Sequence, residues 1–206
     1  MPDLAPSKIV CVGRNYAAHA RELGNAVPKE PLLFLKPPSS LLRPGESIRL
    51  PTVSNRVEFE GEIGVVVGQR LRHVSSDVAR GAIVGVCAVN DVTARDLQKS
   101  DVQFTRAKGF DTFCPVGELA AVPEDLSSLR IRTLVNGEVR QDGSSADMVF
   151  DIPALLSYIS GVMTLESGDL VLTGTPEGVG TLGPGDVVEV EIAGVSRVSN
   201  PVITDD

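Results

Sequence analysis

Residues 57–67, VEFEGEIGVVV, place three glutamates at alternate positions directly ahead of an apolar run. In an extended chain, residues two apart point to the same face, so Glu58, Glu60 and Glu62 project together. Because like charges so placed repel, either water screens them, a cation lies among them, or one carboxyl keeps its proton at a raised pKa. An E-x-E pair by itself is more often the solvated edge of an antiparallel sheet, so the stretch needs support from the rest of the chain.

The rest of the chain consists of short β-like runs, separated by many of its 20 glycines and 14 prolines. This punctuation predicts many short strands and few helices. We expect residues 57–67 to form one long strand, and SKIVCVG, LLFLK, SIRLP, AIVGVCAVN, DLVLTGTP, DVVEVEI and GVSRVSNPV to be strands or extended segments. The pair Asn136-Gly137 predicts a hairpin turn. Residues 15–23, 151–162 and the stretch DVTARDLQKS are expected to be helical, and Ser76 or Asp77 could cap a further helix through Val78 and Ala79. The fold class is mainly β (α+β), with about four short helices.

The composition limits the function classes. With 206 residues, of which 42% are hydrophobic and 22% charged, the chain suits one globular domain. A net charge of −8 argues against a nucleic-acid partner, which requires clustered basic residues. No apolar run approaches the roughly 20 residues of a membrane helix, and no targeting segment is evident, so we expect no membrane partner and a cytoplasmic location. The three cysteines are odd in number and far apart, which indicates reduced core residues.

One familiar motif is misleading here. Residues 178–183, GVGTLG, match the G-x-G-x-x-G pattern, but that pattern binds dinucleotides only where it opens a helix. The sequence PGD and a predicted strand follow it, so we interpret the glycines as a tight loop. There is no G-x-S-x-G elbow, Walker loop or C-x-x-C pair.

Three groups of residues could carry chemistry. Two same-face glutamates can share one hard divalent cation, and Asp91, where an apolar strand ends, is a candidate third ligand. His19 and Glu22 share a helix face, which suits an oriented general base, although such pairs are usually only solvated. Donors for an anion are Arg95 and Gln98, one turn apart, and Lys108, each of which taken alone could be ordinary surface charge.

The order of these pieces resembles the fumarylacetoacetate hydrolase family over nearly the whole chain, and looks like its small single-domain acylpyruvase and oxaloacetate decarboxylase members. The matching stretches are IVCVGRNYAAHARELG, EPLLFLKP, EFEGEIGVVVG, NDVTARDLQ, AKGFDTFCP, VNGEVRQDG and LVLTGTPEGVG. The resemblance implies a β-roll of mixed sheets with a few short helices, and a homodimer. It also implies that residues 1–206 are a single catalytic domain, with a lid segment at 15–30 and without the N-terminal domain of longer relatives.

By this resemblance, the metal ligands would be Glu60, Glu62 and Asp91, with Mg²⁺ (or Mn²⁺) as the ion and Glu58 at or beyond the rim of the site. The resemblance gives catalytic roles to His19, Glu22 and Lys108, and substrate-binding positions to Arg95, Gln98, Gly109 and Thr175. We find no clear equivalent, near Asn15, of the further acidic ligand that some larger members have.

The implied substrate is a short 2-oxo acid. The implied reaction is metal-dependent cleavage of a C–C bond through a pyruvate enolate, as acylpyruvate hydrolysis, oxaloacetate decarboxylation or both. An isomerase or tautomerase of 2-oxo or 2-hydroxy-dienoate acids is the alternative within enzymes, because it uses the same electron sink. A catalytically silent metal- or ligand-binding module is the alternative from another class.

Overall fold

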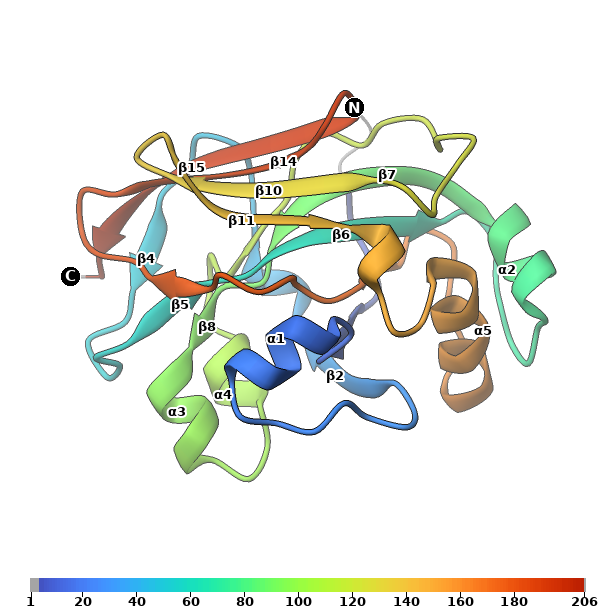
Figure 1. Ribbon diagram of the computed structural model, residues 1–206, viewed down its shortest axis with the longest axis horizontal. Helices are drawn as coiled ribbons and strands as arrows, with labels where there is room; N and C mark the ends of the chain where they lie inside the picture. The colour runs from blue at the N-terminus through green and yellow to red at the C-terminus, as the bar shows by residue number, and fades with distance from the viewer. Residues whose placement is uncertain (1–3, 206) are drawn as a thin grey trace.

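Two five-stranded sheets form the body of the protein, and a computed structural model describes residues 4–205 of it (Figure 1). The first sheet has the order β2-β1-β12-β6-β7, with bounds Leu32–Lys36, Ile9–Gly13, Leu170–Leu172, Gly61–Val67 and Ile83–Asn90. The second has the order β11-β10-β14-β15-β4, with bounds Glu138–Ser144, Arg130–Val135, Val187–Ile192, Ser196–Thr204 and Ile48–Leu50. Both sheets are mixed, since β1 runs parallel to β12 and β15 parallel to β4 while the other pairs are antiparallel.

Smaller elements close the ends of these sheets. A three-stranded sheet has the order β13-β5-β8 (Gly180–Thr181, Val57–Phe59, Thr93–Ala94), and β3 (Leu41–Leu42) pairs with β9 (Cys114–Pro115). The helices are α1 (Ala17–Glu22), α2 (Ser76–Gly81), α3 (Arg95–Ser100), α4 (Thr105–Lys108) and α5 (Ile152–Val162), with 3₁₀ turns at Pro38–Ser40 and Ser145–Asp147. The predicted mainly β fold with mixed sheets and short helices is confirmed.

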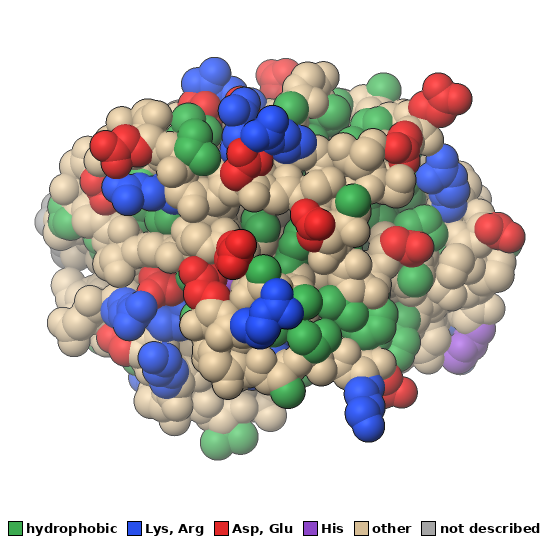
Figure 2. All heavy atoms as spheres, in the orientation of Figure 1, with side chains coloured by type: hydrophobic (Ala, Val, Ile, Leu, Met, Phe, Trp, Pro, Cys, Tyr) green, Lys and Arg blue, Asp and Glu red, His purple; other side chains and the backbone are tan. Residues whose placement is uncertain are grey.

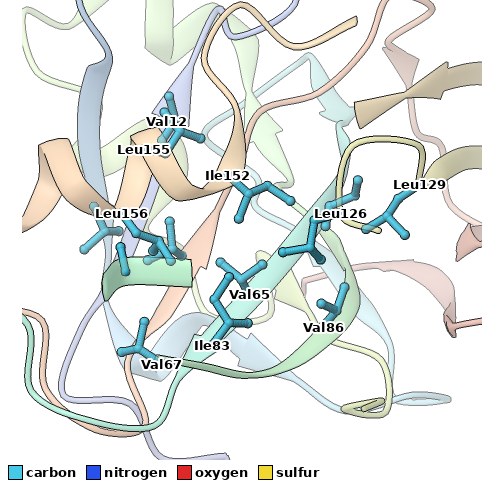
Figure 3. Close-up of a cluster of buried hydrophobic side chains, with 14 of the residues drawn as sticks. Val12, Val65, Val67, Ile83, Val86, Leu126, Leu129, Ile152, Leu155 and Leu156 are labelled. Carbon is cyan, nitrogen blue, oxygen red and sulfur yellow. The ribbon is translucent and has the colours of Figure 1, made fainter. Parts of the chain in front are cut away.

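The largest hydrophobic cluster holds the two sheets together. Strand β6 is buried at every residue, and Val65 on it contributes to this cluster with Val86 of β7. The second sheet contributes Val190. Leu155 comes from α5 (Figure 3). Because β6 is covered on both faces, residues 63–67 are continuously apolar rather than alternating, and this buried run holds the first residues of the strand in a fixed position.

Residues 57–67 do not form the single long strand that we expected. They divide into β5 and β6, which belong to different sheets, and Glu60 lies between them. The Glu60 amide donates to the Asn90 side chain (3.0 Å) instead of a neighbouring strand, while the Glu60 carbonyl accepts from the Asp91 amide (2.8 Å). A side chain therefore takes over one ladder bond at the point where the chain passes from one sheet to the other.

Several local sequence patterns elsewhere predicted the structure correctly. The turn between β10 and β11 has φ of 53° at Asn136 and 81° at Gly137, as the predicted hairpin requires. Residues 178–183 form a loop and the short strand β13, not a helix. Cys11, Cys87 and Cys114 are free and buried, as expected. Within residues 4–205, no helix has the length and apolar character needed to cross a membrane.

Candidate metal centre

A glycine fixes the side on which the acidic residues of the opening stretch lie. A Cβ on Gly61 would approach Thr133 Oγ1 of the second sheet to 2.0 Å, so the backbone of β6 touches that sheet directly at its first residue. Since side chains alternate along a strand, Glu62 projects to the opposite face. Asp91 follows the paired strand β7 and joins Glu60 and Glu62 there, and one carboxylate oxygen from each of the three lies within 4.8 Å of the others.

Two buried lysines neutralise part of this cluster. Lys108, at the end of α4, donates to Glu60 Oε2 (2.7 Å) and to Asp91 Oδ2 (2.6 Å). Lys36, at the end of β2, donates to the other Asp91 oxygen, Oδ1 (2.6 Å). Burial alone would lower the pKa of Lys108, but the carboxylates of Asp91 and Glu60 raise it above its usual value, so this ammonium stays charged.

Arg95 connects the fourth carboxylate, Glu58, to the cluster. Its Nε donates to Glu58 Oε2 (2.7 Å), a second nitrogen contacts Glu60, and Nη1 donates to Gln98 Oε1 (2.6 Å). Arg56 binds the remaining oxygen of Glu58 (2.6 Å). Glu58 does not belong to the cluster of three carboxylates, and it is 1% exposed and pairs with two arginines instead of lying at a solvated rim.

The two glutamates of the cluster are in opposite electrostatic situations. Burial works to raise the pKa of Glu60, but Lys108 and Arg95 outweigh it and hold that pKa well below its usual range. Burial raises the pKa of Glu62 well above its usual value, and the charges of Asp91 and Glu60 raise it further. The only hydrogen bond to the Glu62 carboxylate comes from the Gly174 amide (2.6 Å) within the described chain. Glu62 therefore lacks the cation that its neighbour has.

This donor set fits a hard divalent cation. All three groups offer carboxylate oxygens, they are buried, and they belong to strands or strand ends that are anchored in the core. Mg²⁺ and Mn²⁺ prefer such oxygen ligands. An ion there would supply Glu62 with its missing counter-charge, so the residues present are compatible with the predicted ion.

His19 and Glu22 form the predicted pair on α1. His19 Nδ1 lies 3.2 Å from Glu22 Oε2, and His19 is 4% exposed. The other oxygen of Glu22 accepts from the Gly178 amide (3.0 Å), which ties α1 to the loop before β13. Glu22 therefore orients the imidazole and is itself held in place, as the carboxylate partner of a general base requires.

These groups share one cavity of about 470 Å³. Nine of the ten predicted site residues line it: His19, Glu22, Glu60, Glu62, Asp91, Arg95, Gln98, Lys108 and Thr175. Acidic and basic side chains lie close together on the surface beside α1, the helix that contributes His19 and Glu22 to the lining (Figure 2). The tenth, Gly109, does not line the cavity; a Cβ there would meet the Thr105 carbonyl at 2.5 Å, so its role is to let the chain turn tightly after Lys108.

Sequence reasoning missed two supporting residues. Lys36 ends the apolar run LLFLK and is buried, whereas its neighbour Leu35 is 47% exposed. At this end of β2 the charged side chain is therefore inside and the apolar one outside, the reverse of the usual pattern. Glu58 was placed outside the site, yet it fixes Arg95. A lone lysine in a strand bounded by prolines was the available signal for Lys36, but only the pairing of β2 with β1 brings it to Asp91.

Comparison with known proteins gives the family. Residues 8–203 match the model of the fumarylacetoacetate (FAA) hydrolase C-terminal domain. A protein of Arabidopsis thaliana named oxaloacetate tautomerase FAHD1, mitochondrial, is 48% identical over 93% of this chain and 89% of its own. One of Dictyostelium discoideum named oxaloacetate decarboxylase, mitochondrial, is 44% identical over 91% and 89%.

Among solved structures, a 5-carboxymethyl-2-hydroxymuconate delta-isomerase from Mycobacterium smegmatis superimposes with a TM-score of 0.90. The two sequences are 43% identical, and the match covers 98% of this chain and 80% of that one. The relatives thus carry names of enzymes that act on oxaloacetate or isomerise related acids. The protein described here belongs to the fumarylacetoacetate hydrolase family.

Proposed function

We propose that this protein is a divalent-metal-dependent enzyme that carries out enolate chemistry on short 2-oxo acids, with oxaloacetate as the first candidate substrate. The observation that carries the proposal is the buried cluster of Glu60, Glu62 and Asp91 in one cavity with Lys108 and His19. The names of the relatives support oxaloacetate in particular. Mg²⁺ or Mn²⁺ held by the three carboxylates would stabilise the negative charge that develops on the 2-oxo oxygen.

The residues of the chain itself would bind and polarise the substrate. Lys108 stays charged and contacts Glu60 and Asp91, so its ammonium lies beside the place where the substrate oxygens would bind. Gln98 accepts from Arg95 through Oε1, which leaves its amide NH₂ to donate to a substrate oxygen. These preorganised donors would favour the enolate over the ground-state acid.

Proton transfer would fall to His19. With Glu22 accepting the Nδ1 proton, the Nε2 atom of the imidazole is the basic one. In tautomerisation His19 would take the proton from C3 while the 2-oxo oxygen gains one from solvent, or carry out the reverse. In decarboxylation Nε2 would first take a proton from solvent and then give it to C3 after CO₂ has left. Both reactions need the same binding groups.

Acylpyruvate hydrolysis is the second candidate, and the pairing of His19 with Glu22 is the observation that favours it. An imidazole oriented by a carboxylate is the arrangement that removes a proton from water for attack on the distal carbonyl. The enolate of pyruvate would then be the leaving group, stabilised by the same ion and by Lys108.

Parallel assays would separate these activities. The protein is mixed with enol-oxaloacetate, keto-oxaloacetate or acetylpyruvate, in Mg²⁺, in Mn²⁺ and in EDTA. We expect metal-dependent turnover of oxaloacetate, and we expect His19→Asn to abolish acetylpyruvate hydrolysis while decarboxylation, which needs no attacking water, is retained in part. Because oxaloacetate decarboxylates slowly with free metal, a Glu60→Gln variant measures the background. No metal-dependent turnover of any substrate would refute the proposal and favour a silent binding module.

Three further expectations accompany this proposal. We propose a homodimer, which sedimentation velocity would test, and a cytoplasmic location. We also propose that residues 15–30 act as a lid, since α1 lies on the cavity wall and contacts Gly178. Hydrogen exchange in α1 should slow when Mg²⁺ and oxalate are added together, and unchanged exchange would argue against a lid.

A further inference from the structure

A non-glycine residue in a left-handed conformation lies at the C-terminal end of β1. Arg14 follows the last residue of β1 directly, has φ of 59° and lines the cavity that contains the carboxylate cluster. Residues other than glycine adopt this conformation at a cost, and they keep it only where the surrounding structure imposes it.

The next residue imposes it. Asn15 is completely buried, and its side-chain amide donates to the carbonyl oxygens of Thr173 (2.8 Å) and Phe150 (3.0 Å). Its side-chain oxygen accepts from the Phe150 amide (2.9 Å), and its own carbonyl accepts from the Val149 amide (2.7 Å). Four hydrogen bonds therefore hold the backbone just after Arg14, and they fix where this arginine leaves the sheet.

Within the described residues, the guanidinium of Arg14 has no hydrogen-bond or ion-pair partner. Five cationic residues line the cavity in the described part of the chain: Arg14, Arg56, Arg95, Lys99 and Lys108. Arg56, Arg95 and Lys108 are paired with carboxylates. Among residues 4–205, the side chains of Arg14 and Lys99 have neither a hydrogen-bond nor an ion-pair partner, and Arg14 is half-buried whereas Lys99 is exposed.

The balance of charges around the cavity also favours the binding of an additional anion. The lining includes four carboxylates, Glu22, Glu60, Glu62 and Asp91, against the five cations. A divalent ion at the cluster would leave an excess of positive charge larger than one substrate carboxylate can balance. A half-buried, unpaired guanidinium is a ready receptor for a further carboxylate, which it can bind through two parallel hydrogen bonds.

We propose that Arg14 is the residue that receives the distal carboxylate of a dicarboxylic 2-oxo acid such as oxaloacetate, the carboxylate at the end away from the 2-oxo group. This assignment rests on the proposed function for the place where the first carboxylate and the 2-oxo group bind. It makes Arg14 a specificity-determining residue: an acid with a neutral distal end would enter the same cavity without this contact.

Equilibrium binding to the Mg²⁺-loaded protein tests the assignment without catalysis. The probes are 2-oxoglutarate and 2-oxopentanoate, which have the same carbon chain and differ only in whether C5 is a carboxylate or a methyl group. The variants are Arg14→Gln, Arg14→Lys and Lys99→Gln. Arg70→Gln is the matched control, since Arg70 is exposed, pairs with Glu166 and does not line the cavity.

We expect the wild-type protein to bind the diacid about ten- to hundredfold more tightly than the monoacid, as a charge-assisted pair allows. Arg14→Gln should remove most of this preference by weakening only the diacid, Arg14→Lys should restore part of it, and Arg70→Gln should leave it unchanged.

A wild-type protein without preference, or an Arg14→Gln variant that weakens both acids equally, would overturn the assignment. An effect of Lys99→Gln as large as that of Arg14→Gln would also overturn it, because the preference would then come from the overall positive charge of the cavity and not from one contact. A preference that depends on Arg14, in a protein that turns over no 2-oxo acid, would support this assignment while refuting the proposed reaction.

Discussion

Replacing Lys108 by methionine removes the cation that contacts two of the three clustered carboxylates. Lys108 is 2% exposed and donates to Glu60 at 2.7 Å and to Asp91 at 2.6 Å. Methionine keeps much of the side-chain volume, so the main change is the loss of a buried positive charge. Removing one partner of a buried ion pair typically costs about 3–5 kcal/mol, because the other partner remains buried without compensation. We expect a loss of this size in the free energy of unfolding in EDTA.

A divalent ion should reduce this loss. Without Lys108 the carboxylates attract the ion more strongly, and an ion present at about 100 times its dissociation constant stabilises the folded state by about 2.7 kcal/mol. The measurement is urea denaturation of wild type and variant, with EDTA and with Mg²⁺. Lys99→Met is the control, since Lys99 lines the same cavity without an ion pair in residues 4–205 and should be nearly neutral.

The loss should also depend on pH, in a direction set by Glu60. In the wild type, the pKa of Glu60 is held below its usual range against the effect of burial, chiefly by Lys108. A lowered folded pKa contributes stability that is fully present above about pH 5 and is lost as the pH falls through the unfolded value of about 4.3 and below. The difference between wild type and Lys108→Met should therefore shrink in acid. A variant as stable as wild type in EDTA at pH 7, or a difference that Mg²⁺ enlarges, would refute this view of the cluster.

Three more predictions follow from single contacts. Burial, Asp91 and Glu60 raise the pKa of Glu62, so Mg²⁺ binding should release a proton and should tighten as the pH rises. Calorimetry in buffers of different ionisation enthalpy measures the release, and Glu62→Gln should abolish it. Because Glu58 holds Arg95 in place, Glu58→Gln should lower kcat with little change in Mg²⁺ affinity, and Glu58→Asp should recover part of the lost kcat. Equal losses of kcat in the two variants would indicate a purely structural role for Glu58. Gly61→Ala should destabilise the protein by about 1–3 kcal/mol in thermal unfolding, because its Cβ would overlap the second sheet; a neutral result would contradict the direct contact.

Short-range patterns were enough to predict most elements of the fold. The Asn136-Gly137 turn and the helix that begins after Asp151 depend on local backbone chemistry, and both are present. The Asp151 side chain accepts from the Ala154 amide (2.8 Å), a cap that needs no distant partner. Such features are determined within a few residues, and the sequence therefore carries them directly.

The division of residues 57–67 could not be predicted in this way. An alternating glutamate pattern gives no sign that the chain changes sheets at Glu60, because the change depends on Asn90, which lies 30 residues away. The burial of Lys36 and of Glu58 has the same origin, since each carries a charge that only a distant partner makes acceptable inside the protein. The members of the candidate site were predicted from the resemblance, whereas the ion pairs among them could be seen only in the tertiary structure.

Binding of Mn²⁺, followed by electron paramagnetic resonance, is the most direct test of the carboxylate cluster as a metal centre. The wild-type protein should bind one Mn²⁺ per chain, and oxalate, a mimic of the 2-oxo acid head, should change the spectrum of the bound ion. Glu60→Gln and Asp91→Asn should each weaken Mn²⁺ binding strongly, while Glu166→Gln, which alters an exposed carboxylate paired with Arg70, should not. Mn²⁺ binding that is unaffected by Glu60→Gln and Asp91→Asn would contradict a metal centre at these residues.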